Sequence, residues 1–237
     1  MQTEPIGEVR IQTRTSLFSG TYRMLCFQSA TMAACVVSNH VVFLDLPHDR
    51  YFCLEPRKES AALAILRRAA ELDTSSSEFG TTQVLRSERF LPVKVEAITA
   101  SAIDSALPQP PARSVAEALF SNARALIELK FRSLSKSIER VRQGAGTHGP
   151  VKGRKNEPLP AILAAHLASH RLLSAHDRCL PLSIGLAKRL RHERHAVDLV
   201  IGVRMDPFAA HAWVQQGNVV LNDDLDHVRA FQPILVA

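Results

Sequence analysis

A proline cluster divides the chain into two parts with different hydrophobic patterns, since Pro108, Pro110 and Pro111 stand within four positions. Upstream, short β-branched and aromatic runs alternate with Asn, Pro and Asp, which favours strands joined by tight turns. Downstream, apolar residues recur at helical spacing before strand-like runs return. Proline removes backbone donors and stiffens a chain, so we expect a linker at residues 94–113. The 237-residue sequence therefore predicts an α+β fold with two domains.

The first unit, residues 30–93, has the pattern of a small β-β-β-α-α module. Its strands contain Val, Phe and Tyr, and Ser-Asn-His and Pro-His-Asp-Arg separate them. The expected elements are three strands at 31–37, 41–46 and 51–54, a helix at 58–72, and a second short helix at 81–88. Residues 1–29 form an extension that the pattern leaves open between a strand and a loosely packed segment.

The second unit, residues 114–237, is expected to begin with a long helix from Ser114 to about Arg142. Ser114 is the predicted N-cap, with Glu117 three positions later in a capping-box arrangement. The expected apolar stripe of this helix is Leu119, Ala123, Leu126, Ile127, Leu134 and Ile138. After a glycine-rich loop at 143–156, the expected elements are helices at 159–173 and 179–191 and strands at 197–203, 211–216 and 218–222.

Composition excludes several classes of protein. Hydrophobic residues make up 46% of the chain, which is enough for a core and argues against disorder. No run of about 18 apolar residues exists, so we expect no membrane span. The N-terminus lacks the apolar core of a secretory signal. The four cysteines include no C-x-x-C pair, so we expect reduced thiols in a cytoplasmic protein. We interpret Cys26, Cys35 and Cys53 as buried structural residues.

The fourth cysteine, Cys179, lies where a loop gives way to a helix, and Pro181 stands in the first turn. A thiol at a helix N-terminus has a lowered pKa, which favours the thiolate. Further on, His211 opens a strand, and an Asn-Asp-Asp run follows a hairpin. A cysteine, a histidine and a carboxylate could act as nucleophile, base and orienting group, in the chain order of papain-like and transglutaminase-like enzymes. The alternation of side chains along a strand does not decide whether Asp223 or Asp224 is the orienting carboxylate.

Other chemistry-bearing features have simpler interpretations. His166 and His170 are spaced like zinc ligands on a helix, but no third ligand is evident, so we predict no metal site. The loop at 143–156 is basic and is either solvated or a docking site for an acidic partner. It is not a P-loop because Pro150 occupies the position of the required lysine, and we predict no cofactor.

Four segments resemble the leader peptidases of lasso-peptide biosynthesis, the so-called B proteins, which have a transglutaminase-like cysteine-protease fold. They are Cys179-Leu180-Pro181, LVIGV at 199–203, PFAAHAWV at 207–214 and Asn222-Asp223. The steps of 32 positions from Cys179 to His211 and 12 to Asp223 match the spacing of that family's triad. Many members carry a fused leader-recognition domain, similar to the winged-helix chaperone of pyrroloquinoline quinone synthesis, and VVFLDLPHDRYFCLEP (41–56) resembles its second and third strands.

The resemblance implies a winged-helix-like β3α module for leader recognition at 30–93 and a cysteine endopeptidase domain at 114–237. It assigns the catalytic roles to Cys179, His211 and Asp223. It also implies that the leader adds a strand to the exposed sheet edge at about Tyr51–Leu54 and packs against the short helix expected near Thr81–Glu88. The implied leader-binding residues are Tyr51, Phe52, Cys53, Leu54, Val84 and Leu85. The implied partners are a lasso precursor peptide and an asparagine-synthetase-like lasso cyclase, and a threonine near the end of the leader is the implied cleavage determinant.

The sequence departs from the family at Leu182, where arginine is expected, and at Gln215, where glutamate commonly follows H-A-W-V. Two other functions stay open. A transglutaminase-like acyltransferase would use the same triad on an amine. A nucleic-acid-binding winged-helix protein would fit the net charge of +6, but the expected second helix carries only Arg86 and Arg89, beside Glu88.

Overall fold

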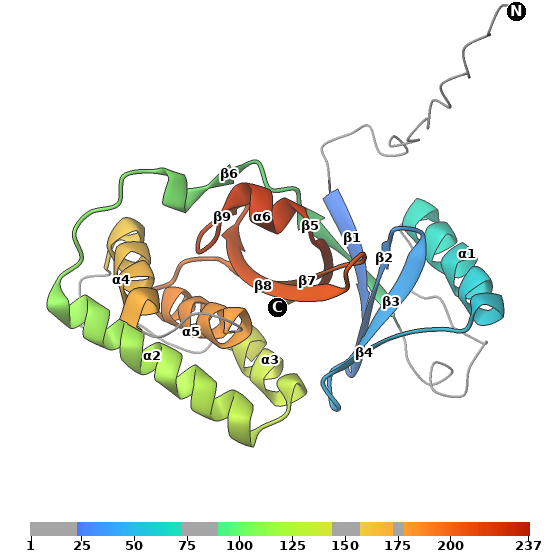
Figure 1. Cartoon of the computed structure of the whole chain (residues 1–237), viewed down its shortest axis with the longest axis horizontal. Coiled ribbons are helices and arrows are strands. Elements are labelled where there is room, and N and C mark those ends of the chain that lie inside the picture. The colour runs from blue at the N-terminus through green and yellow to red at the C-terminus, as the bar shows by residue number, and fades with distance from the viewer. Residues whose placement is uncertain (1–22, 73–89, 144–156, 173–177) are drawn as a thin grey trace, which may run out of the picture.

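The computed structural model describes residues 23–72, 90–143, 157–172 and 178–237. They form an α+β architecture of two five-stranded sheets with helices on the outer sides, as Figure 1 shows. The elements are β1 (Arg23–Gln28), β2 (Met32–Val37), β3 (His40–Asp45), β4 (Arg50–Cys53), α1 (Pro56–Leu72), β5 (Leu91–Glu96), β6 (Ala100–Ser101), η1 (Ala102–Asp104), α2 (Ala112–Phe131), α3 (Leu134–Gln143), α4 (Leu159–Leu172), α5 (Cys179–His192), β7 (Asp198–Arg204), β8 (Ala209–Gln216), β9 (Val219–Val220), α6 (Leu225–Arg229) and β10 (Gln232–Val236).

The first sheet has the strand order β4-β3-β2-β1-β5 and is antiparallel throughout. The three predicted strands are present as β2, β3 and β4. Ser38 and Asn39 both have positive φ (48° and 66°), the geometry of a tight hairpin turn that matches the twist of the strands. The sheet is larger than predicted because the N-terminal extension supplies β1 and the segment after α1 supplies β5. The second short helix expected at 81–88 lies outside the described residues.

The two faces of the first sheet have different partners because side chains alternate along a strand. On β3, Val41 and Phe43 pack in a small cluster with residues of α1. Val42 and Leu44 point to the opposite face and belong to the main hydrophobic core. The first sheet is therefore buried on both sides.

The second sheet has the order β10-β7-β8-β9-β6, with α2 to α5 on its outer side (Figure 1). Its central strands, β7 and β8, form an antiparallel hairpin in which Gly202 is opposite His211. An added Cβ at Gly202 would approach the Trp213 ring to 2.7 Å, so only glycine leaves room for this buried indole. The glycine thereby fixes how closely β7, β8 and the Trp213 ring pack.

The two sheets share one core, so the units are not separated by a free spacer. β10 packs on β1, β2, β3 and β5, and Arg142 Nη2 of α3 donates to Gln28 Oε1 of β1 at 2.8 Å. The linker predicted at 94–113 is much shorter in the structure. β5 ends in the first sheet at Glu96, β6 begins in the second sheet at Ala100, and Ile98 between them is buried.

The long helix predicted from Ser114 to Arg142 is two helices, α2 and α3, and Ser114 is not its cap. Pro111 is the N-cap residue, and no side chain caps the helix. The predicted apolar stripe is wrong for α2, since Ile127 is 59% exposed, whereas it is right for α3, where Leu134 and Ile138 are buried. The buried positions of α2 are instead Ser114, Ala118, Asn122, Ala125 and Glu128.

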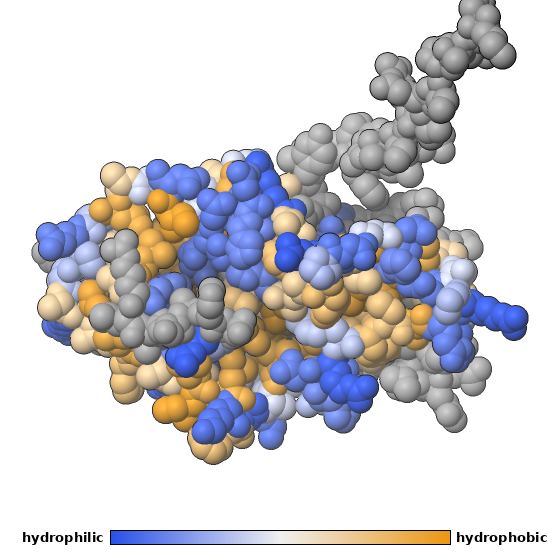
Figure 2. Space-filling view, viewed as in Figure 1, coloured by the Kyte–Doolittle hydropathy of each residue, from blue (hydrophilic) through white to orange (hydrophobic). Residues whose placement is uncertain are grey.

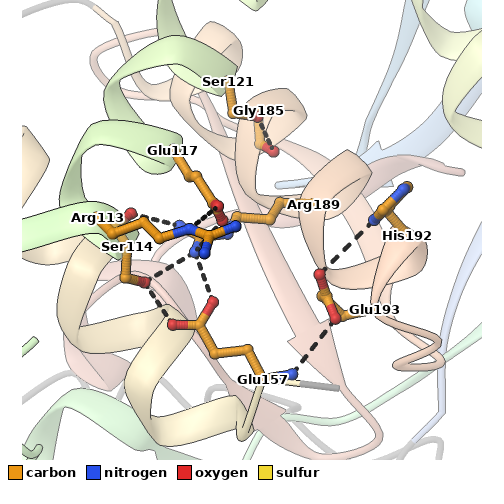
Figure 3. A network of polar contacts seen from close by, with 9 residues as sticks. All are labelled: Arg113, Ser114, Glu117, Ser121, Glu157, Gly185, Arg189, His192 and Glu193. Carbon is orange, nitrogen blue, oxygen red and sulfur yellow. Dashed lines mark hydrogen bonds and ion pairs between the residues drawn. The ribbon is translucent and has the colours of Figure 1, made fainter. Parts of the chain in front are cut away.

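A polar network explains why α2 turns Ser114 inward (Figure 3). Arg189 of α5 donates to Ser114 Oγ at 2.8 Å and pairs with Glu157 at 2.7 Å. Ser114 Oγ also donates to Glu157. The network joins α2, α5 and the residues before α4, so a buried cation takes the place that apolar packing would fill. Within the described residues, no helix is both long and apolar enough for a membrane crossing.

Candidate active site

Cys179 is the first residue of α5, at the end where helix N–H groups have no partner within the helix. Arg178 is the N-cap and makes no side-chain cap bond, so these donors are not occupied by a capping side chain. The sulfur is partly buried, and the backbone of Ala212 and Leu180 lowers the pKa of the thiol. The helix dipole and these donors all favour a thiolate.

His211 lies on β8 beside this helix, and its Nε2 is 2.6 Å from Asp223 Oδ2. Since Asp223 occupies Nε2, the other ring nitrogen is left for Cys179, whose pKa His211 lowers. Asp224, the rival carboxylate, caps α6 instead, because it accepts the backbone N–H groups of Asp226 and His227. The structure thus brings Cys179, His211 and Asp223 together and leaves Asp224 outside.

The three groups shift one another's pKa values in the directions that a thiolate–imidazolium pair requires. Burial raises the pKa of the Cys179 thiol, but the hydrogen bond and charge of His211 outweigh it, and the net shift is downward. Burial lowers the pKa of His211, but the hydrogen bonds and charges of Asp223 and Cys179 raise it to about 9. Burial raises the pKa of Asp223, and hydrogen bonds from His211 and His227 lower it further than burial raises it. At neutral pH the arrangement favours Cys⁻, His⁺ and Asp⁻.

The comparison with protein families agrees with this geometry. Residues 125–236 match the transglutaminase-like superfamily, and the matched segment contains Cys179, His211 and Asp223. The C-terminal part of the chain is a transglutaminase-like domain. Such domains belong to cysteine-dependent enzymes, both proteases and acyltransferases. Neither the search of curated proteins nor that of solved structures gave a match.

A chain of side-chain hydrogen bonds connects the helix that carries Cys179 to the strand that carries His211. Ser183 Oγ donates to the carbonyl of Ala212 at 2.9 Å and accepts from Asn222 Nδ2 at 2.9 Å. Asn222 Oδ1 in turn accepts the N–H of Val214 at 2.8 Å. Ser183 is four positions after Cys179 and therefore on the same face of α5. The sequence analysis missed this serine, although its spacing from the thiol was a usable signal.

His227 is the second residue of the transglutaminase-like domain that the sequence analysis missed. Its Nδ1 is 3.1 Å from Asp223 Oδ1, and its ring lies 4.6 Å from that of His211. Asp223 is therefore held on both carboxylate oxygens by histidines. The segment predicted to be a linker also helps to position Asp223, since Ser101 Oγ donates to the backbone carbonyl of Asp223 at 2.7 Å.

Metal ligation is possible in principle at the same place. Within the described residues, donor atoms of His211, Asp223 and His227 lie within 4.8 Å of one another. The hydrogen bonds from each histidine to Asp223 already use these atoms, which accounts for the cluster without a metal. His166 and His170, the pair weighed as zinc ligands, contact each other instead, with their Nε2 atoms 2.9 Å apart. Burial holds the pKa of His166 well below its ordinary value.

The predicted leader-binding strand is β4, the last strand of its sheet, whose outer edge pairs with no strand of the described residues. Phe52 and Leu54 pack toward α1, whereas Cys53 is exposed, contrary to its interpretation as a buried structural cysteine. Tyr51 packs on the main core, as Cys179 does, and its ring lies 5.5 Å from that of Phe208 in the turn before β8. Val84 and Leu85 lie outside the described residues.

The departures from the resembling family have structural explanations. Leu182, in place of arginine, is 2% exposed and packs in the core. Gln215, in place of glutamate, is fully buried: its Oε1 accepts from Trp213 Nε1, and its Nε2 donates to the carbonyls of Glu96 and Gly217. A glutamate at this position would have no amide protons for these two carbonyls.

Proposed function

We propose that this protein is a cysteine peptidase that binds the leader of a ribosomally made precursor peptide and removes it before lasso cyclisation. The observation that carries the proposal is the Cys179–His211–Asp223 arrangement in a transglutaminase-like domain. A second observation supports peptide binding. The outer edge of β4 pairs with no strand of the described residues, and Tyr51 of β4 packs against the same core as Cys179, so a peptide added to that edge would bind the unit that shares its core with the thiol.

The mechanism follows from the protonation states at neutral pH. The Cys179 thiolate attacks the scissile carbonyl carbon, and the carbonyl π electrons move onto oxygen. Backbone N–H groups at the start of α5 face the oxyanion. The imidazolium of His211 then gives its proton to the leaving amine as the C–N bond breaks, which produces an acyl-enzyme. His211, now neutral, takes a proton from water, which hydrolyses the thioester and regenerates the thiolate.

Asp223 holds the imidazole so that its Nε2 keeps a proton and the other nitrogen serves the sulfur. The released core peptide would pass to an asparagine-synthetase-like cyclase in the cytoplasm. If an amine rather than water reaches the acyl-enzyme, the same residues perform acyl transfer. Mass spectrometry of the products distinguishes the two reactions, because hydrolysis leaves a free carboxylate at the cleaved bond.

The test uses the purified chain and a lasso precursor peptide. We expect Cys179→Ala to abolish cleavage, since loss of a nucleophile typically costs about 10⁶-fold in rate, while a labelled leader still binds in an anisotropy titration. His192→Ala, at the far end of the same helix and 47% exposed in its side chain, is the matched control and should cleave normally. Cleavage by Cys179→Ala at a comparable rate would show that the thiol is not the nucleophile.

A further inference from the structure

Helix α2 has its polarity reversed with respect to an ordinary surface helix. Its buried face carries Asn122 and Glu128. Its outer face carries Phe120, Ile127 and Phe131, which are 70%, 59% and 76% exposed. Spacings of seven and four residues align these three side chains in one stripe. Such a stripe is unfavourable in water and marks a contact surface.

Exposed large apolar residues are concentrated on this helix. Among the described residues, two others are exposed, Leu91 on β5 and Phe208 before β8, each on a different element. Figure 2 shows hydrophobic areas along the lower left edge of the molecule, over α2, interrupted by strongly hydrophilic ones. The stripe is therefore a local feature of α2 and not a general property of the surface.

A groove of about 730 Å³ lies beside the stripe, between α2, α3 and α5, and Phe120 is part of its lining. It contacts α5 at Lys188, Arg189, Arg191 and His192, the opposite end of the helix from Cys179. The groove is thus a concave surface that is separate from the thiol and from the β4 edge.

The groove has an excess of positive charge. Glu128, a buried acid in its lining, is already paired with Lys188 at 2.7 Å and with Arg140 at 3.4 Å, which leaves one cation in excess. Arg124 and Arg132 also line the groove, are exposed, and have no carboxylate partner within the described residues. Three positive charges in excess therefore adjoin three exposed apolar side chains.

We propose that this surface docks an amphipathic acidic helix of another protein, with its apolar side against the α2 stripe and its carboxylates over Arg124 and Arg132. Charge complementarity selects this occupant. An acidic helix satisfies both parts of the surface, since apolar anchors cover the stripe and exposed carboxylates meet the guanidinium groups of Arg124 and Arg132.

Two other occupants fit less well. A second copy of the chain, packed stripe to stripe, would bring together Arg124 and Lys130 of the two α2 helices and the Arg132 that follows each helix, and like charges oppose such contacts. A nucleic acid would meet the arginines through its phosphates, but it would leave Phe120, Ile127 and Phe131 without apolar cover.

The experiment measures binding of a fluorescein-labelled synthetic helix to the full chain by anisotropy. The probe is about 20 residues long, long enough to form a helix, with leucines at i, i+3, i+4 and i+7 and glutamates elsewhere. We expect saturable binding that weakens with salt. Phe120→Ser with Phe131→Ser, and separately Arg124→Glu with Arg132→Glu, should each weaken binding at least tenfold.

Matched single changes on other surfaces serve as controls. Leu91→Ser removes an exposed apolar residue, and Arg57→Glu reverses an exposed charge on α1, and both should leave probe affinity unchanged. Peptide cleavage, whichever way the proposed function is decided, should be the same in all these variants. Equal affinity of wild type and both double variants would overturn the proposal. So would a dimer in light scattering that Phe120→Ser with Phe131→Ser dissolves, or a duplex DNA that binds this surface more tightly than the probe.

Discussion

Replacing Asp223 by asparagine tests the electrostatic design of the site most sharply. In the structure, Asp223 Oδ1 accepts the backbone N–H of Asp224 at 2.8 Å, and Oδ2 faces His211 Nε2 at 2.6 Å. The backbone donor is fixed, so an asparagine at 223 would keep its carbonyl oxygen toward Asp224. Its NH₂ group would then face His211 Nε2 and donate to it. That contact stabilises the wrong tautomer and opposes the imidazolium.

The magnitude follows from the pKa of His211. The rise from 6.5 to about 9 corresponds to about 3 kcal/mol in favour of the charged imidazole, and Asp223 supplies the largest favourable part. We expect cleavage by Asp223→Asn to fall by up to ~10⁴-fold, as a mis-set tautomer does in the serine triad. The wild-type pH profile should be bell-shaped, rising as Cys179 ionises below its ordinary pKa and falling as His211 loses its proton near pH 9. In Asp223→Asn the alkaline limb should move to lower pH.

The assay follows iodoacetamide alkylation of Cys179 against pH, with peptide mass spectrometry to separate it from the exposed Cys53. Precursor cleavage is measured in parallel. Asp224→Asn is the control, because asparagine caps helices about as well as aspartate, and it should stay within a few-fold of wild type. A normal rate and an unmoved alkaline limb in Asp223→Asn would refute the argument. The opposite ranking of the two variants would transfer the orienting role to Asp224.

Three further changes probe neighbouring contacts. His227→Ala removes a hydrogen bond to Asp223 Oδ1 and should lower kcat about 5-fold, the equivalent of about 1 kcal/mol. KM should stay unchanged, and the alkaline limb of the pH profile should move to lower pH. A change in KM alone would contradict a positioning role. Ser183→Ala leaves Asn222 without an acceptor and should lower the free energy of unfolding by about 2 kcal/mol in urea titrations; an unchanged midpoint would exclude this. Cys53→Pro should weaken leader binding by anisotropy through the altered β4 edge, and unchanged affinity would exclude strand addition there.

The sequence predicted local elements better than their partners. β2, β3 and β4 could be recognised because runs rich in β-branched residues are separated by turn residues. Ser38 and Asn39, which have positive φ in the structure, form one of these turns. Nothing in the pattern revealed that β1 and β5 complete the sheet, because pairing depends on residues far apart in the chain. The inner face of α2 was misassigned for a physical reason: Arg189 and Glu157 bury Ser114, and a hydrophobicity pattern does not foresee a buried polar network.

In the candidate active site, too, local features could be predicted from the sequence and long-range contacts could not. Cys179 and His211 could be predicted, since each lies within a regular element with a readable face. The third residue could not be chosen from strand parity, because β9 ends at Val220 and Asp223 lies beyond the strand, where alternation no longer applies. Its position depends on tertiary contacts, the bonds from Ser101 and His227.

The two sheets of this protein are structurally coupled, and the coupling has a consequence for truncation. Only residues 97–99 separate β5 of the first sheet from β6 of the second. β6 is an edge strand of the second sheet, and Ser101 on it holds the backbone of Asp223. A fragment that starts at the prolines would lose this strand and would expose the face of β10 that packs on β1 and β2. We therefore expect residues 112–237 alone to be poorly soluble or to cleave far more slowly than the full chain, whereas a stable and fully active fragment would show that the shared core is dispensable for the site.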